Sequence, residues 1–146
     1  MTDISATIEI DRPAGEVFDY LADMANNPQW QQGQQECRWT SEPPLGLGST
    51  YDQEARFLGR SIVSSFEVVE FEPGRRIRIV STAGTMPIDV TRTVEPIGPD
   101  RCRVSARVAG DPPLLLRLLG PLLDRLVERS VTGDYRRLKE RLEQGS

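Results

Sequence analysis

Tight turns follow one another closely along residues 35–109, and this spacing restricts the chain to one kind of sheet. Segments rich in β-branched and aromatic residues are separated there by PPLGLG, LG, PGR, AG and PIGPD, which are typical of loops and hairpins. Because connections this short cannot carry the chain back to the other end of a sheet, successive strands must run antiparallel. Together with the alternating segment ISATIEI near the start of the chain, they predict an antiparallel sheet of about seven strands.

The clearest strands bury one face of this sheet and expose the other. Apolar residues occupy most alternate positions in the last two strands, while the arginines of RCRVSARV point the other way. These apolar positions are Met86, Ile88, Val90, Val94, Cys102, Val104, Ala106 and Val108. Residues 61–71 alternate less regularly, so we expect a bulge or bend in that strand, and its facing stays open.

Two short helices are expected between the first strand and the rest of the sheet. In DRPAGEVFDYLADM, Asp11 can cap a helix and Pro13 suits its first turn. Val17, Phe18 and Leu21 then recur at the spacing of one apolar stripe. The segment ANNPQW interrupts this helix and leads into the second short one.

A long C-terminal helix is the remaining element that can cover the buried face of the sheet. From Leu116 to Leu142 apolar residues recur every three or four positions, and a leucine-rich segment opens the stretch. Pro121 lies inside it and is expected to kink the helix or to divide it. The longest uncharged run, residues 118–123, is far too short for a transmembrane segment, although the leucine-rich half would also suit a membrane surface.

Composition narrows the chemistry and the partners. With 146 residues the chain fits a single domain, residues 1–146, and without histidine it can form neither a Ser-His-Asp triad nor a Cys-His pair. Cys37 and Cys102 are too far apart for a zinc motif, so we expect no metal and no cofactor. A net charge of −4 argues against a nucleic-acid partner, and the absence of a secretory signal favours a cytoplasmic location. Formation of a homodimer stays open.

The order of these elements resembles the START-like (SRPBCC) helix-grip superfamily, in particular its polyketide cyclase/dehydrase-like group. RPAGEVFDYLAD and NPQW are similar to that family's first helix and the Pro-x-Trp after it, and LGLGSTY is similar to its glycine-led third strand. FEVVEFEPGRRIRI is similar to a turn joining two of its strands, and DYRRLKERLE to its closing helix. The resemblance implies an α+β fold in which a curved antiparallel sheet wraps around the long C-terminal helix. It also implies a cavity between the two.

The candidate ligand-binding residues lie on the strands and on the C-terminal helix that are expected to surround this cavity. They are Trp39, Tyr51, Gln53, Phe66, Met86, Ile88, Arg92, Leu119 and Leu123. Trp39 and Tyr51 each combine a large apolar ring with a polar tip, and Gln53 could anchor a carbonyl or hydroxyl group. Trp30 is expected to act as a structural plug against the first helix.

Arg92 is the unusual residue in this set, because alternation places its charge on the apolar face of the sheet. An unpaired buried charge is expensive. Arg92 therefore reaches a carboxylate, reaches solvent at the sheet edge, or meets an anionic ligand. Cys37 and Cys102 also have arginine neighbours that could favour a thiolate, but small buried apolar residues are the preferred interpretation.

Two functions from different classes fit these residues. The first is binding of an apolar small molecule, such as a lipid, terpenoid or polyketide-like compound. The alternative is a polyketide aromatase/cyclase-type enzyme in which Tyr51, Gln53 or Arg92 polarises a carbonyl group. A regulatory domain that binds a protein partner is a weaker third alternative. No catalytic residue is assigned, because a carrier cavity can be wholly apolar whereas a cyclase needs convergent polar groups with a shifted pKa.

Overall fold

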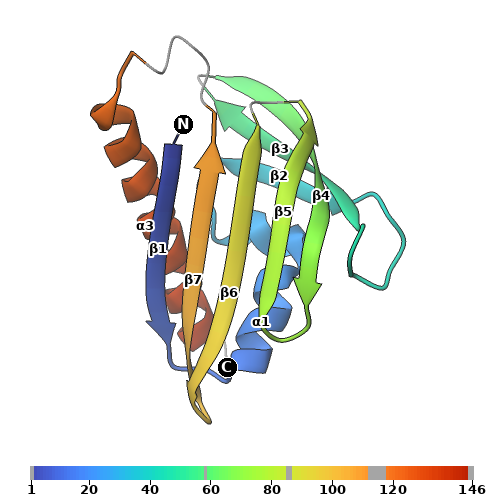
Figure 1. The fold of residues 1–146 in the computed structure, drawn as a ribbon, viewed down its shortest axis with the longest axis vertical. Coiled ribbons are helices and arrows are strands. Elements are labelled where there is room, and N and C mark those ends of the chain that lie inside the picture. Colours follow the sequence, from blue (N-terminus) through green and yellow to red (C-terminus); the bar gives the residue numbers. More distant parts are fainter. Residues whose placement is uncertain (1, 58, 85–86, 112–117, 145–146) are drawn as a thin grey trace.

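The computed structural model describes residues 2–57, 59–84, 87–111 and 118–144, which form one sheet with helices on one of its faces (Figure 1). The elements follow in the order β1 (Thr2–Ile10), α1 (Ala14–Ala22), the 3-10 helix η1 (Met24–Gln29), β2 (Gln34–Trp39), β3 (Thr50–Phe57), β4 (Arg60–Glu72), β5 (Arg76–Ala83), β6 (Ile88–Gly98), β7 (Arg101–Gly110) and α3 (Pro121–Gln144). This is the predicted order of one strand, two short helices, further strands and a terminal helix.

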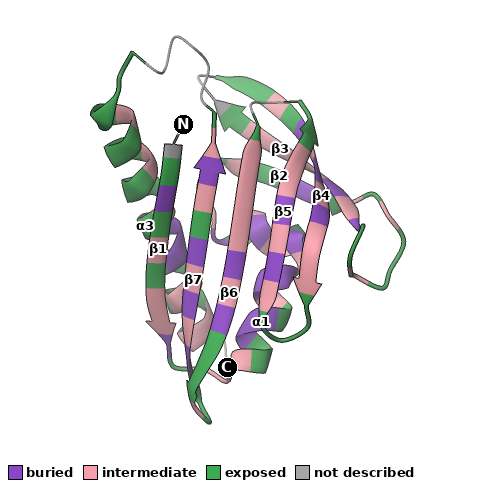
Figure 2. Cartoon of the chain, in the orientation of Figure 1, coloured by how far each residue is buried: buried purple, intermediate pink, exposed green. Residues whose placement is uncertain are grey.

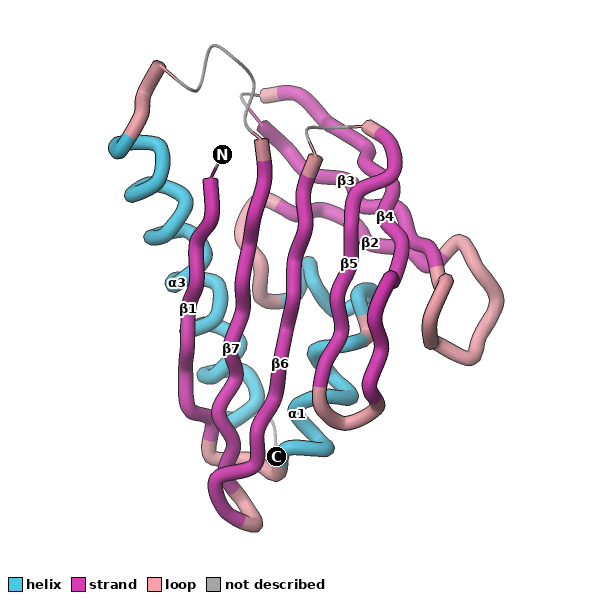
Figure 3. The backbone as a smooth tube through the Cα atoms, in the orientation of Figure 1, coloured by secondary structure: helices cyan, strands magenta, loops and turns pink. Residues whose placement is uncertain are grey.

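The strands of the described ranges form one antiparallel sheet, which confirms the predicted sheet of about seven strands. Their order across the sheet is β1-β7-β6-β5-β4-β3-β2. Successive strands from β2 to β7 are neighbours, and β1 pairs with β7 along its whole length. In Figure 3 the strands β2 and β3 run obliquely across the view, at an angle to β6 and β7, so the sheet is strongly curled. Its concave face holds α1, η1 and α3.

The structure shows which residues of β4 face the core, a question that the sequence left open. Ser64, Phe66 and Val68 are buried, whereas Val63 is 55% exposed. The pairing of β4 with β5 shifts register after Ser65 and again after Val68. These irregularities are the expected bulge, and they explain why the apolar residues of this strand do not follow one strict alternation.

The helix α3 begins at Pro121, which corrects the expectation that this proline kinks or divides a longer helix. Proline suits the first turn of a helix because its missing N–H would have no partner there and its φ is already helical. Gly120 precedes it with a φ of 50°, a left-handed conformation that glycine adopts without strain. The leucines at positions 114–116, which the sequence assigned to this helix, lie outside the described residues.

The second half of α3 is the part that packs on the concave face of the sheet. Tyr135 and Leu138 are buried against the sheet, whereas Leu118, Leu122 and Leu126 are 84%, 55% and 53% exposed. In Figure 1 the first turns of α3 lie to the side of β1, while the later turns run behind the sheet. The leucine-rich segment is therefore not the main cover. No helix in the described part of the chain is long and apolar enough to cross a membrane.

The core lies between the concave face of the sheet, α1 and the second half of α3. Figure 2 shows buried positions alternating with less buried ones along the central strands. The largest fully buried side chains are Trp30, Tyr51, Phe18, Ile10, Leu21, Met24, Ile77, Leu138, Val17, Val68, Val94 and Val104. Both cysteines also belong to this core, and burial raises the pKa of Cys37 to about 11 and raises the pKa of Cys102. They therefore remain protonated and act as small apolar residues.

Candidate functional site

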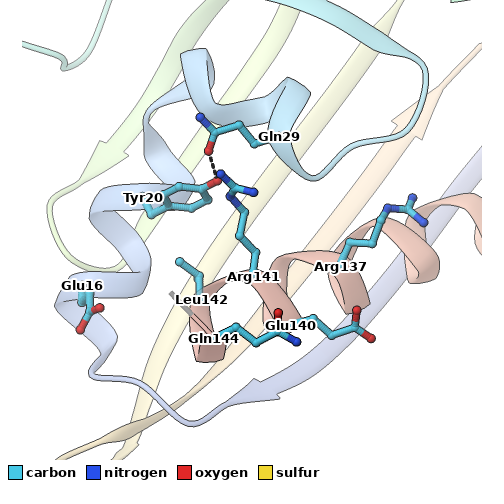
Figure 4. Close-up of a pocket in the computed structure, with 8 residues that line it drawn as sticks. All are labelled: Glu16, Tyr20, Gln29, Arg137, Glu140, Arg141, Leu142 and Gln144. Carbon is cyan, nitrogen blue, oxygen red and sulfur yellow. Dashed lines mark hydrogen bonds between the residues drawn. The ribbon is translucent and has the colours of Figure 1, made fainter. Parts of the chain in front are cut away.

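A large hollow on the described surface is an open polar groove between α1, η1 and the end of α3 (Figure 4). Its volume is about 730 Å³, and its lining consists of Glu16, Tyr20, Gln29, Arg137, Glu140, Arg141, Leu142 and Gln144. The Tyr20 hydroxyl donates to Gln29 Oε1 at 2.5 Å, and the Arg141 guanidinium points toward the same hydroxyl in Figure 4. Because these polar groups largely serve one another or solvent, the groove is a weak candidate for an apolar ligand.

A smaller, partly open cavity lies between the concave face of the sheet and α3. Its volume is about 170 Å³. The residues that line it are Asn27, Gln31, Gln34, Tyr51, Gln53, Phe66, Ile79, Ile88, Val90, Arg92, Val108, Val131, Asp134 and Tyr135. The structure thus brings together five of the nine residues that the sequence proposed, namely Tyr51, Gln53, Phe66, Ile88 and Arg92. Their role in ligand binding stays a prediction.

The other four candidates are not placed at this cavity. The Trp39 indole donates to Asp23 Oδ1 at 2.8 Å and borders a shallow surface hollow instead. Leu119 is 40% exposed in the turn before α3, and Leu123 is half-buried in the first turns of that helix. Neither leucine lines the cavity, because this end of α3 lies beside β1. Met86 lies outside the described residues.

Aromatic rings form the β3 and β4 side of the cavity. Tyr51 stacks on Phe66 with ring centroids 5.1 Å apart and an interplanar angle of 12°. Trp39 contacts the Tyr51 ring edge-on, with ring centroids 5.3 Å apart. The Tyr51 hydroxyl is buried without a hydrogen-bond partner, and burial raises its pKa. Tyr51 therefore presents a neutral phenol that can donate a hydrogen bond.

Arg92 meets neither the carboxylate nor the solvent that the sequence suggested. The residue is 3% exposed, and it makes no ion pair with any carboxylate of the described residues. Its Nη1 donates instead to the carbonyl oxygen of Leu21, at 3.0 Å, and to Asn27 Oδ1, at 3.1 Å. The guanidinium lies over the Trp30 ring, 4.9 Å from its centroid, in a cation-π contact. The C-terminal end of α1 and the helix η1 thus position a buried cation at the cavity.

Trp30 and Tyr135 complete the surroundings of this cation. Their ring centroids are 5.0 Å apart in an edge-on contact, and both residues are almost fully buried. Trp30 is 2% exposed, and its ring contacts Tyr135 and Arg92; its predicted role as a plug against the first helix stays a prediction. Burial raises the pKa of Tyr135, while the nearby Arg92 cation partly offsets that effect.

Asp134 is the functional candidate that sequence reasoning missed. Its carboxylate accepts hydrogen bonds from the Gln32 backbone N–H, at 3.1 Å, and from Arg137. A signal was present, because Asp134 lies three residues after Val131 and four before Leu138 and so falls on the apolar stripe of the helix. Burial raises the pKa of Asp134 against the opposing effects of its hydrogen bonds and of two arginines.

The raised pKa of Asp134 predicts a pH dependence of stability. The native chain holds this proton more tightly than the unfolded chain does. Its contribution to the free energy of unfolding therefore falls as the pH rises from the ordinary value of 3.8 through the raised folded value, and is constant above it. We expect Asp134→Asn to lack this pH-dependent contribution. The wild type should therefore gain stability relative to the variant as the pH falls from the raised folded pKa of Asp134 to its ordinary value. Urea unfolding over a pH series measures the difference; a pH-independent difference would contradict the prediction.

Solved structures of similar shape support the predicted helix-grip fold. A START superfamily protein from Mycobacterium smegmatis has a TM-score of 0.86 and 20% identity over 100% of both chains. The Zhui aromatase/cyclase from Streptomyces sp. R1128 has a TM-score of 0.73 and 13% identity over 99% of this chain and 97% of its own. The di-domain ARO/CYC BexL from the BE-7585A biosynthetic pathway has a TM-score of 0.76 and 21% identity over 98% of this chain and 47% of its own. Identities this low show the fold alone.

The family is shown by a whole-chain match. No curated protein sequence matches the chain significantly. The model of a family described as polyketide cyclase / dehydrase and lipid transport, however, matches residues 1–143. Together with the START-like fold, this match confirms the predicted resemblance: the chain belongs to the polyketide cyclase/dehydrase and lipid transport family.

Proposed function

We propose that the protein binds a compact, largely apolar small molecule in the cavity between the sheet and α3. The observation that carries this proposal is the cavity itself, a partly open space to which both layers of the fold contribute apolar walls. Those walls are Phe66, Ile79, Ile88, Val90, Val108 and Val131. Apolar walls combined with a few polar groups are typical of a site that binds a small apolar molecule.

The volume of the cavity indicates the size of this molecule. Pockets for drug-sized ligands measure roughly 300–1,000 Å³, whereas an engineered cavity of about 150 Å³ holds benzene. At about 170 Å³ the cavity resembles the second class. Of the compounds expected from the sequence, a small terpenoid or a short polyketide-like ring system fits better than a long lipid chain. Mass spectrometry of the native protein, purified from its own host, tests this by giving the mass of a retained molecule.

Filling the cavity should weaken the binding of an apolar probe. Val108 contributes to the wall from β7 and is half-buried. We expect Val108→Phe to weaken the binding of toluene by at least about tenfold, at a stability cost of about 1–3 kcal/mol for the tighter core. Val63→Phe is the matched control, because Val63 is 55% exposed and lies on the other face of the sheet. Equal toluene affinity in the wild type and in both variants, measured by NMR titration, would rule out this cavity as the site.

Catalysis of the cyclase/dehydrase type is the second candidate function. The observation in its favour is that Asp134, whose pKa is raised, lines the same cavity as Tyr51 and Arg92. A carboxyl group whose pKa is raised can exchange a proton with a substrate whose carbonyl the donors polarise. If so, Asp134→Asn abolishes the consumption of a small polyketone and leaves its binding intact. Turnover that survives this substitution would contradict a proton-transfer role for Asp134.

A further inference from the structure

We infer that the molecule bound in this cavity carries an anionic oxygen group, a carboxylate or an enolate, held by Tyr51, Tyr135 and Arg92. The inference rests on the proposed binding function and adds the chemical class of the ligand. It starts from three donor atoms that the protein leaves unused.

The three donors are buried and make no hydrogen bond of normal geometry, although the Arg92 guanidinium lies near the Tyr135 hydroxyl and partly offsets the rise in its pKa that burial causes. They are the hydroxyl groups of Tyr51 and Tyr135 and the Nε of Arg92, in residues that are 1%, 4% and 3% exposed. All three residues line the same cavity. Buried polar groups are nearly always hydrogen-bonded, because leaving one without a partner costs about 1–3 kcal/mol. Three unsatisfied donors at one cavity therefore indicate an acceptor that arrives from outside.

The other polar groups at the cavity do not show this pattern. The Gln34 amide donates to Gln31, and its Oε1 accepts a hydrogen bond from the Cys37 thiol at 3.2 Å. The Cys37 thiol also approaches Gln53 Oε1 at 3.8 Å, and Asn27 accepts from Arg92. These amides largely satisfy themselves, so the unused hydrogen-bonding capacity is concentrated at the two phenols and the guanidinium.

The charges around the cavity favour a negative group over a neutral one. Arg92 is a cation that lacks an ion pair among the described residues, and burial keeps both phenols protonated and able to donate. Asp134 is the carboxylate among the lining residues. Its charge is already paired with that of Arg137. Hydrogen bonds from donors to a charged oxygen are about twice as strong as those to a neutral one.

Benzoate and nitrobenzene are a matched pair of probes for this inference, because they share size and shape and differ in charge. Each is titrated into the ¹⁵N-labelled protein, and binding is followed at the backbone amides and at the Arg92 Nε–H resonance. We expect benzoate to bind at least about tenfold more tightly and to shift the Arg92 resonance. Tyr51→Phe and Tyr135→Phe should each weaken benzoate about tenfold and leave nitrobenzene unchanged. Tyr20→Phe, the same substitution outside the cavity, should change neither affinity.

The remaining outcomes separate the two proposals. If both probes bind with equal affinity, or if the phenylalanine variants weaken both equally, the anionic group is wrong while the binding cavity stands. That result would mean that ordered water satisfies the three donors. If neither probe shifts the resonances of residues that line the cavity, the proposed function itself fails. Both phenylalanine variants keep the aromatic ring, and the nitrobenzene titration shows that each variant retains the folded cavity.

Discussion

Replacing Trp30 by alanine should lower the free energy of unfolding by about 3–5 kcal/mol. The side chain is 2% exposed and lies between the Tyr135 ring, at 5.0 Å, and the Arg92 guanidinium, at 4.9 Å. Its removal leaves a cavity and also takes the aromatic face away from a buried cation, a contact worth about 2 kcal/mol where water is excluded. Because domains of this size are stable by only about 5–15 kcal/mol, this single change approaches the whole margin.

Urea unfolding followed by circular dichroism measures this loss of stability. Two further variants show whether the loss is specific to the Trp30 side chain and to its aromatic face. Trp30→Phe keeps an aromatic face beneath Arg92, so its loss should be clearly smaller. Trp39→Ala removes the other tryptophan of the chain, which is half-buried and bonded to Asp23, and should also cost less. A Trp39→Ala variant less stable than Trp30→Ala would show that the cluster around Arg92 does not organise the core as described.

Leu138→Ala should cost about 2–5 kcal/mol, whereas Leu126→Ala on the same helix should be nearly neutral. Leu138 is 0% exposed in the half of α3 that covers the sheet, and Leu126 is 53% exposed near the leucine-rich end. The pair compares the same chemical change at two positions on one helix, one buried and one exposed.

Thermal and urea denaturation of the two variants provide the comparison. Similar losses in both would indicate that the leucine-rich end of α3 is buried in solution, against the sheet or against another molecule. A dependence of the Leu126→Ala loss on protein concentration would distinguish a second copy of the chain from an intramolecular contact.

The sheet could be predicted from the sequence because its signals are local. Turn residues such as the Pro73-Gly74 pair fix where strands end, and short connections fix that neighbours are antiparallel. Alternation then assigns the facing of each regular strand, which is why Cys102, Val104 and Ala106 were correctly placed inside. In β4 the bulges that interrupt this alternation depend on pairing with β5, which the sequence of one strand does not encode.

The same difference between local and long-range signals explains which residues of the candidate site could be predicted. Tyr51, Gln53 and Arg92 lie on strands, where alternation gives the facing directly, and all three reach the cavity. Leu119 and Leu123 do not, because helical periodicity shows which residues share a face but not where along the helix the sheet ends. The partners of Arg92 were also missed, since a backbone carbonyl 71 residues away in the chain has no signature in sequence.

Because the Arg92 cation lies over the Trp30 ring, the intrinsic fluorescence of Trp30 can report on what binds at Arg92. Indole emission responds to the local electric field, and the Arg92 guanidinium lies 4.9 Å from the centroid of the Trp30 ring. An anion that neutralises Arg92 would shift the emission of Trp30, and replacing Trp39 would leave that signal free of background. Libraries of unlabelled compounds can thus be screened by fluorescence alone.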